Sequence, residues 1–267
     1  MQTQDVTAGF QNVDASETEF LIQFLADANR IPSAVDSFET QLKLLDIQPG
    51  NHVLDIGCGI GDRAMQMARL VGSEGKVIGT DLSHAMVRAS ESRHADAGLP
   101  LEFHASDACH QPFADESFER IRTERVLMYL KDMDAAFQEF RRLLKSGGKL
   151  VAVDFDWDAL VFSHADKSLT RRIVEFISDS FPYGRIGADL FRYFKHFGFK
   201  DITIKPIAYT PPLEITKRVC GGIIQTGVSK NVFSEAEIMD WWAALERDDE
   251  ADKFFMAFQG YIVVGTK

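Results

Sequence analysis

The 267-residue chain has few of the features that mark secreted, membrane-spanning or metal-binding proteins. Its cysteines are Cys58, Cys109 and Cys220, an odd number without a CxxC pair, which argues against a disulfide framework and a zinc site. No apolar run approaches the roughly 18 residues of a membrane helix. The N-terminus is polar and acidic rather than signal-like. We therefore expect a cytoplasmic protein with no metal site and no membrane partner.

Basic charge is also scarce. The chain has 29 Lys and Arg residues against 40 Asp and Glu residues, which gives a formal net charge of -11. Nucleic-acid binding needs a net basic surface, so nucleic acid is not expected as the main partner. The 45% hydrophobic and 26% charged fractions are ordinary for a globular protein. We expect a small-molecule partner, and we expect the protein to be a monomer or a homodimer.

Short apolar runs alternate with amphipathic segments between residues 52 and 156. This alternation predicts an α/β fold, with parallel strands and crossover helices on both faces of the sheet. Strands are expected at 52–56, 76–80, 101–105, 118–123, 148–155, 200–210 and 254–267. Helices are expected within 1–47, divided at Pro32, and in insertions at 157–199 and 212–250. We interpret residues 1–267 as one domain whose N-terminal helices and insertions cap the active site.

The stretch "HVLDIGCGIGDRAMQMARL", residues 52–70, joins a strand to a helix through a glycine-rich turn. Gly57, Gly59 and Gly61 allow the backbone to approach a ligand closely, and the helix start offers unpaired N–H groups. The later glycine of GxGxxG is missing, and no GK[ST] follows, which excludes a P-loop. A turn without a ligand, a nicotinamide dinucleotide and a cofactor without phosphate stay open on this evidence.

Two carboxylates follow at the same expected edge of the sheet. Asp81 ends a strand, where it can accept both hydroxyls of a ribose or, instead, cap the helix that opens at Ser83. Asp107 and Ala108 follow the next strand, where an acid beside exposed backbone can bind an adenine, although Asp107 also suits a turn. Open α/β sheets bind ligands at the carboxyl ends of their strands, so we expect these loops to meet at one ligand.

Together these segments resemble the class I S-adenosylmethionine-dependent methyltransferases. "VLDIGCGIG" is similar to the first motif of that family, "VIGTDLS" to its acidic loop, and "SDACHQPFADESFERI" to its adenine loop and following strand. "LLKSGGKLVAVDF" is similar to the motif before the fifth strand. The match covers about Gln48 to Asp156, in the order and spacing of the family. The resemblance implies a Rossmann-like, doubly wound sheet of seven strands with an antiparallel last strand.

The resemblance also implies S-adenosylmethionine as cofactor and a set of residues that bind it. These are Asp55, Gly57, Cys58, Gly59, Gly61, Asp81, Leu82, Asp107, Ala108, Thr123, Glu124 and Arg125. The glycines and Asp55 are implied at the methionine moiety, Asp81 at the ribose, and Asp107 at the adenine. The chain departs from the family at Met128 and Tyr129, where a histidine is common, so no catalytic role is carried over to those positions.

The acceptor side depends on the segment "VDFDWDALVFSH". Asp156 and His164 are the candidates for a general base, and alternation along the strand puts Asp154 and Asp156 on one face and Trp157 on the other. Phenylalanine is frequent, at 21 residues. The aromatic residues of the expected cap are Phe20, Phe24, Phe155, Phe162, Phe176, Phe181, Trp241 and Trp242. We expect methyl transfer by in-line displacement to a small, apolar or aromatic acceptor, at oxygen, nitrogen or carbon.

Two other functions stay open on the sequence. A member of the fold that does not methylate, such as a cyclase or a partner subunit, would bind S-adenosylmethionine without turning it over. A nicotinamide-dependent oxidoreductase would bind NAD, but the missing GxGxxG and the missing Tyr–Lys pair argue against it.

Overall fold

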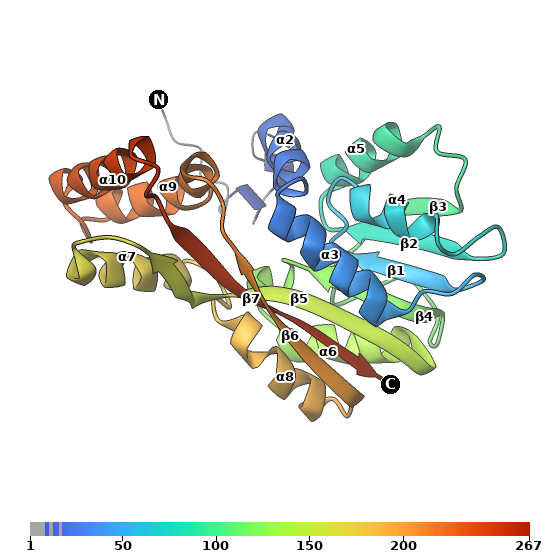
Figure 1. The fold of residues 1–267 in the computed structure, drawn as a ribbon. Helices are drawn as coiled ribbons and strands as arrows, with labels where there is room; N and C mark the ends of the chain where they lie inside the picture. Colours follow the sequence, from blue (N-terminus) through green and yellow to red (C-terminus); the bar gives the residue numbers. More distant parts are fainter. Residues whose placement is uncertain (1–8, 11–12, 16–17) are drawn as a thin grey trace.

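The computed structural model describes residues 9–10, 13–15 and 18–267, so the expected N-terminal segment 1–47 lies partly outside the described residues (Figure 1). The strands are β1 (His52–Ile56), β2 (Lys76–Asp81), β3 (Leu101–Ala105), β4 (Phe118–Glu124), β5 (Leu144–Phe162), β6 (Lys200–Tyr209) and β7 (Met256–Thr266). The helices are α2 (Thr18–Ala28), α3 (Pro32–Leu45), α4 (Asp62–Ala68), α5 (His84–His94), α6 (Met133–Leu143), α7 (Lys167–Asp179), α8 (Ile186–His196), α9 (Leu213–Ser229) and α10 (Glu235–Glu250), with short 3-10 turns η1 (Val13–Ala15) and η2 (Leu127–Tyr129). None of these described helices is long and apolar enough to cross a membrane.

The seven strands form one sheet in the order β3-β2-β1-β4-β5-β7-β6. Strands β1 to β5 pair in parallel, whereas β7 runs antiparallel to both β5 and β6. The order reverses direction at β1, next to β4, which is where open sheets of this kind bind ligands. The expected doubly wound α/β sheet with an antiparallel last strand is confirmed.

Helices cover both faces of the sheet because successive strand residues point to opposite sides. Leu54 and Leu150 belong to the core that includes α6 and α8, while Val53 and Val151 belong to the core beneath α3 and α4. All four side chains are fully buried. At 25 cal/mol for each Å² of apolar surface buried, such side chains each stabilise the fold by about 1.5–3 kcal/mol.

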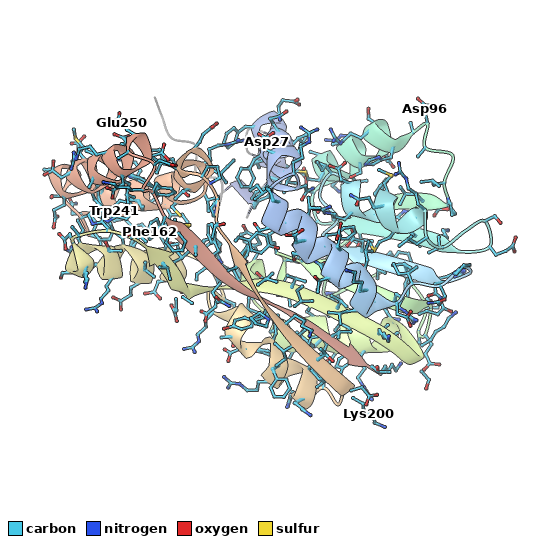
Figure 2. All side chains as sticks on the ribbon, in the orientation of Figure 1. Asp27, Asp96, Phe162, Lys200, Trp241 and Glu250 are labelled. Carbon is cyan, nitrogen blue, oxygen red and sulfur yellow. The ribbon has the colours of Figure 1, made fainter. Side chains whose placement is uncertain are left out.

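The fifth strand is longer than expected, so the insertion predicted at 157–199 begins later than residue 157. Residues 157–162 continue β5, because buried Trp157 and Phe162 alternate with exposed Asp158 and Val161, and because β7 supplies an antiparallel partner. Helices α7, α9 and α10 gather around this end of β5 and β7 (Figure 1). Figure 2 shows Phe162 close to Trp241 there, with ring centroids 5.1 Å apart.

Asp154 is a fully buried carboxyl group in the middle of β5. Its Oδ1 accepts the N–H of Phe155 at 2.9 Å, and its Oδ2 accepts the N–H of Met128 at 3.2 Å. The bond from Met128 attaches β5 to η2, which follows β4. Burial raises the pKa of Asp154 to about 7, although the backbone N–H donors favour the ionised form.

Replacing Asp154 by Asn should make the stability of the protein less dependent on pH. The unfolded chain loses the Asp154 proton near the ordinary pKa of 3.8, whereas the folded chain keeps it up to about pH 7. The free energy of unfolding of the wild type should therefore fall as pH rises through this window, by about 1.4 kcal/mol for each unit of pKa difference.

Urea unfolding of both proteins across this window measures the effect. The stability of Asp154→Asn relative to wild type should increase with pH inside the window and stay constant above it. A difference that does not change with pH would contradict the assignment of a raised pKa.

Candidate active site

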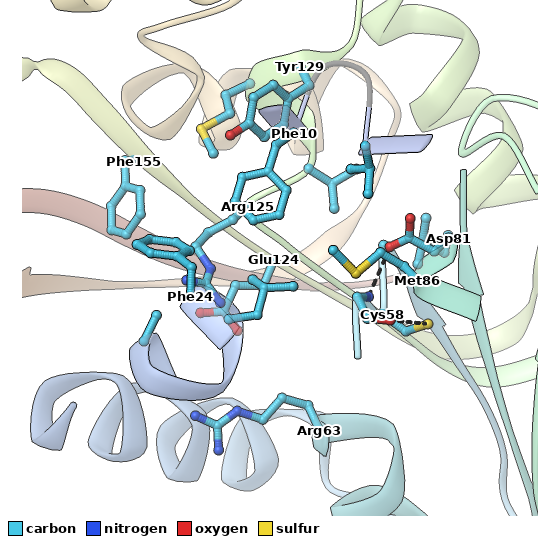
Figure 3. Close-up of a pocket in the computed structure, with 18 of the residues that line it drawn as sticks. Phe10, Phe24, Cys58, Arg63, Asp81, Met86, Glu124, Arg125, Tyr129 and Phe155 are labelled. Carbon is cyan, nitrogen blue, oxygen red and sulfur yellow. Dashed lines mark hydrogen bonds between the residues drawn. The ribbon is translucent and has the colours of Figure 1, made fainter. Parts of the chain in front are cut away.

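A cavity of about 410 Å³ opens at the carboxyl ends of the central strands. Its lining includes residues from the ends of β1, β2 and β4 and from inside β5, together with residues of α2 and α9. In Figure 3, Cys58, Met86 and Asp81 lie on one side of the cavity, and Glu124 and Phe155 lie on the other. The cavity is therefore built at the edge of the sheet to which the sequence assigned a ligand.

The glycine turn forms one wall, and its backbone needs glycine. Gly57, Gly59 and Gly61 have positive φ angles of 73°, 54° and 76°, a region that L side chains rarely adopt. A Cβ at Gly57 would lie 2.1 Å from Cγ2 of Val126, so a larger residue there would displace the loop after β4. Gly57, Cys58 and Gly59 line the cavity, whereas Gly61 does not and lies against Phe103.

The N–H groups of the turn before α4 are bound within the protein. The N–H groups of Gly57 and Cys58 donate to the carbonyl of Thr80 at 2.7 and 2.9 Å. The N–H of Gly59 donates to Oδ2 of Asp81 at 2.9 Å. These bonds attach the turn to β2, because the two strands are parallel neighbours.

Asp81 lines the cavity and connects two loops. Besides the bond from Gly59, its Oδ1 accepts the N–H of Ser83 at 3.0 Å. Ser83 itself caps α5, since its side chain accepts the N–H of Met86. Each carboxylate oxygen of Asp81 therefore accepts one backbone bond and keeps acceptor capacity for a further donor.

The two loops expected near an adenine also reach the cavity. Leu82, 70% exposed, and buried Ala108 both line it. Asp107 lies beside them, and its Oδ1 accepts the N–H of Cys109 at 2.8 Å. The structure thus brings together the three loops that the sequence assigned to one ligand.

A buried ion cluster lies behind the glycine turn. Arg122 donates to Oδ1 of Asp55 at 2.7 Å and to Glu124 through its other guanidinium nitrogen. Its Nε donates to Gln41 at 2.7 Å, and its guanidinium lies 5.2 Å from the ring centroid of Phe38. Asp55, to which the resemblance assigned the cofactor ammonium, is fully buried and does not line the cavity, and Arg122 binds its Oδ1.

Glu124 does line the cavity and is charged. Burial raises its pKa, but Arg122, Arg125 and Arg63 together lower the pKa of Glu124 below its usual value. The hydroxyl of Tyr209 donates to Glu124 at 3.4 Å. Burial and the charge of Glu124 raise the pKa of Tyr209, which stays a neutral donor.

Arg125 follows β4 in an unusual backbone conformation. Its φ is +57°, and its N–H donates to the carbonyl of Val153 at 2.9 Å. Such a conformation costs about 1–3 kcal/mol in a residue other than glycine and is concentrated at functional sites. The guanidinium lines the cavity and donates to Oδ1 of Asn29 at 3.3 Å. Thr123, by contrast, is fully buried and lies off the lining.

Aromatic side chains form the opposite wall. Phe155, Trp157, Tyr209 and Phe258 all line the cavity. The ring of Phe155 lies 5.1 Å from Tyr209 and 5.8 Å from Trp157, in edge-to-face arrangements. Phe24 of α2, an aromatic residue of the expected cap, lines the cavity as well. Phe162 and Trp241 pack together away from the cavity, where Phe162 ends β5 and Trp241 lies on α10.

Asp156 and His164, the expected general bases, do not line the cavity. Asp156 lies on the face of β5 opposite Phe155 and Trp157, as the alternation of side chains along the strand predicted. The face that carries the two aromatic rings is the one that meets the cavity. His164 follows the end of β5, where its Nδ1 accepts the N–H of Asp166 and its ring lies 5.4 Å from Trp241. The cavity geometry gives no support to either residue as a base.

Several lining residues were missed by sequence reasoning. Arg63 stands in the first turn of α4, and its Nη2 donates to the carbonyls of Asn29 and Ala34 at 3.0 and 3.4 Å. Tyr209 ends β6, and Ile215 and Val219 belong to α9. An arginine at a helix start or an apolar residue in a helix has no local signal for a ligand site.

Comparison with known proteins agrees with this geometry. A family model described as a methyltransferase domain matches residues 47–194. An uncharacterised 37.1 kDa protein in transposon TN4556 of Streptomyces fradiae is 34% identical over 201 residues, which are 74% of this chain and 56% of that protein. A ubiquinone/menaquinone biosynthesis C-methyltransferase of Bordetella avium is 39% identical over 110 residues, 41% of this chain and 43% of that protein.

The chain spans about half the length of these curated relatives. Among solved structures, phosphoethanolamine N-methyltransferase 2 of Haemonchus contortus, in complex with S-adenosylmethionine, has a TM-score of 0.62 at 19% identity. The match covers 100% of this chain and 60% of that one, and it shows a shared fold. The family match over more than half of the chain, the strand order and the glycine turn beside Asp81 together place this protein in the class I S-adenosylmethionine-dependent methyltransferase family.

Proposed function

We propose that the protein transfers a methyl group from S-adenosylmethionine to a small, apolar or aromatic acceptor. One observation carries this proposal. A single cavity of about 410 Å³ joins the glycine turn and Asp81, at one side, to a wall of aromatic rings at the other. Groups suited to a polar cofactor and groups suited to an apolar partner therefore face the same cavity.

The polar groups on the lining fit S-adenosylmethionine, which has ribose hydroxyls, an ammonium and a carboxylate but no phosphate. Asp81 would accept the ribose hydroxyls with the acceptor capacity that its two backbone bonds leave. Asp107 and Ala108 would contact the adenine, and Glu124 would attract the ammonium. When bound, this cofactor supplies an electrophilic methyl group on a sulfonium.

The residues of the chain would then orient the acceptor and exclude water. Phe155 pairs with Gly260 in the sheet, and the N–H of Trp157 donates to the carbonyl of Gly184 at 2.9 Å, so both side chains present a rigid apolar surface. Alignment of two reactants can lower the barrier of such a displacement by about 7–11 kcal/mol. No histidine lines the cavity in the described part of the chain, so the proposal assigns the main contribution to orientation rather than to a histidine base.

The Asp81→Ala variant should lose cofactor affinity. Removing a charged acceptor costs about 1.5–3 kcal/mol for each hydrogen bond, so S-adenosylmethionine and S-adenosylhomocysteine should each bind at least roughly tenfold more weakly. Isothermal titration calorimetry measures this directly. The matched control is Asp96→Ala, since Asp96 is exposed and does not line the cavity.

Thermal unfolding of both variants checks that the turn is still folded, because Asp81 also accepts the N–H of Gly59. Binding of NAD by the wild type, or binding of none of these compounds, would overturn the proposed cofactor. Binding of S-adenosylmethionine with no methylated product from any acceptor would favour a member of the fold that does not methylate.

Narrowing the cavity from α9 should separate acceptor binding from cofactor binding. Ile215→Trp adds a large side chain to the lining from α9. The larger side chain would occupy space that the acceptor needs, so kcat/KM for an acceptor found by labelled-methyl screening should fall roughly tenfold or more, a loss of at least about 1.4 kcal/mol of transition-state stabilisation. The calorimetric affinity for S-adenosylhomocysteine should stay unchanged.

The matched control is Met239→Trp, on α10, where the wild-type side chain is 64% exposed and lies off the cavity. An equal loss of acceptor turnover in both variants, or unaltered turnover in Ile215→Trp, would show that the acceptor binds elsewhere.

A further inference from the structure

Trp157 is enclosed by other aromatic rings in the wall of the cavity. Its ring stacks on Phe181, with ring centroids 4.3 Å apart. It meets Phe155 and Phe258 edge-on, at 5.8 and 5.2 Å. Phe181 does not line the cavity, so it supports the indole from the protein side. These contacts are apolar, so they fix the plane of the ring more strongly than the direction in which its N–H points.

The indole N–H is the one polar group of this side chain, and it donates to a sulfur atom. Nε1 of Trp157 lies 3.2 Å from Sδ of Met128, and the two residues are 3% and 4% exposed. A buried indole N–H needs an acceptor, and a thioether sulfur can serve as a weak one. The bond therefore selects one direction of the indole, because a half-turn about χ2 would carry the N–H away from the sulfur.

Met128 is held on both sides of its own backbone. Its N–H donates to Oδ2 of Asp154 at 3.2 Å, and its carbonyl accepts the N–H of Tyr183 at 3.1 Å. Trp157 is attached to the same loop, since its backbone N–H donates to the carbonyl of Gly184 at 2.9 Å. The sulfur is therefore carried by a fixed backbone, and both Met128 and Trp157 line the cavity.

We propose that Met128 is a positioning residue for methyl transfer, because its sulfur accepts the indole N–H of Trp157 and so sets the orientation of the ring on which the acceptor packs. This inference rests on the proposed function, in which orientation of the acceptor makes the main contribution to the rate. An indole turned the other way would still offer an apolar surface, so the acceptor would bind but would be poorly aligned with the methyl group. Loss of the sulfur should therefore lower kcat more than it raises KM.

The test is a double-mutant cycle of Met128→Leu and Trp157→Phe, measured with an acceptor found by labelled-methyl screening. Leucine keeps the apolar volume of methionine and removes the sulfur. Met128→Leu should lower kcat roughly 2- to 10-fold, the range of one net hydrogen bond, and should change KM for the acceptor less than about twofold. In the Trp157→Phe protein, which has no indole N–H at this position, the same substitution should not lower kcat further.

The matched control is Met67→Leu, on α4, because Met67 is fully buried but does not line the cavity. This variant should keep the kcat and KM of the wild type, and thermal unfolding checks that every variant is folded. An equal loss of kcat from Met128→Leu with and without the indole would overturn the inference, because Met128 would then act independently of Trp157. An unchanged kcat in Met128→Leu would overturn it as well.

A measurement on the wild type does not depend on the folding of Met128→Leu. In the protein saturated with S-adenosylhomocysteine, NMR should show a nuclear Overhauser effect between the indole N–H proton of Trp157 and the ε-methyl group of Met128. The Trp157 resonance is identified by its loss in Trp157→Phe. Absence of this effect would overturn the inference, whereas absence of a methylated product from every acceptor would instead overturn the proposed function.

Discussion

The buried ion pair between Arg122 and Asp55 is the interaction on which the geometry of the site depends. The two residues face each other across the parallel pair of β4 and β1, and each side chain is at least 96% buried. Removing one partner of such a pair leaves an uncompensated buried charge and costs about 3–5 kcal/mol. Because both strands end directly after this pair, it fixes the glycine turn after β1 relative to Glu124 and Arg125 after β4.

The polar and the aromatic residues of the cavity lining come from different strands. The ends of β1 and β2 and the loop after β3 bring glycine, carboxylates and close backbone, which suit a polar nucleoside. The inner part of β5, the end of β6 and the start of β7 bring the aromatic wall of Phe155, Trp157, Tyr209 and Phe258. Strand β4 lies between the two groups in the sheet, and its last residues carry the charges that face both. One sheet edge can therefore present a polar cofactor and an apolar acceptor to each other.

Sequence reasoning succeeded where the signal is local. The doubly wound sheet follows from alternating apolar runs, and the glycine turn with Asp81 follows from a strand, three glycines and an acid at the next strand end. The cluster around Arg122 could not be predicted in the same way, because Arg122 and Gln41 are 81 residues apart and no local pattern relates them. Tyr209 reaches Glu124 across 85 residues for the same reason.

The expected bases show how nearness in sequence can mislead. His164 comes only eight residues after Asp156, but β5 continues to Phe162, which carries the chain roughly 20 Å farther at 3.3 Å for each residue. Asp156 lies at the expected depth in the sheet but on the face opposite the cavity. Which face of a strand meets the ligand depends on packing against other elements, here β7 and α8, and a single strand does not encode it.

We propose that one cavity binds the cofactor at the glycine turn and leaves the aromatic wall free for an acceptor. A crystal structure of the protein with S-adenosylhomocysteine tests it most directly. We expect the ribose hydroxyls to contact Asp81, the adenine to lie beside Asp107 and Ala108, and the sulfur atom to face Phe155 and Trp157. Ligand density against the aromatic wall with no contact to Asp81, or density outside the cavity, would contradict it.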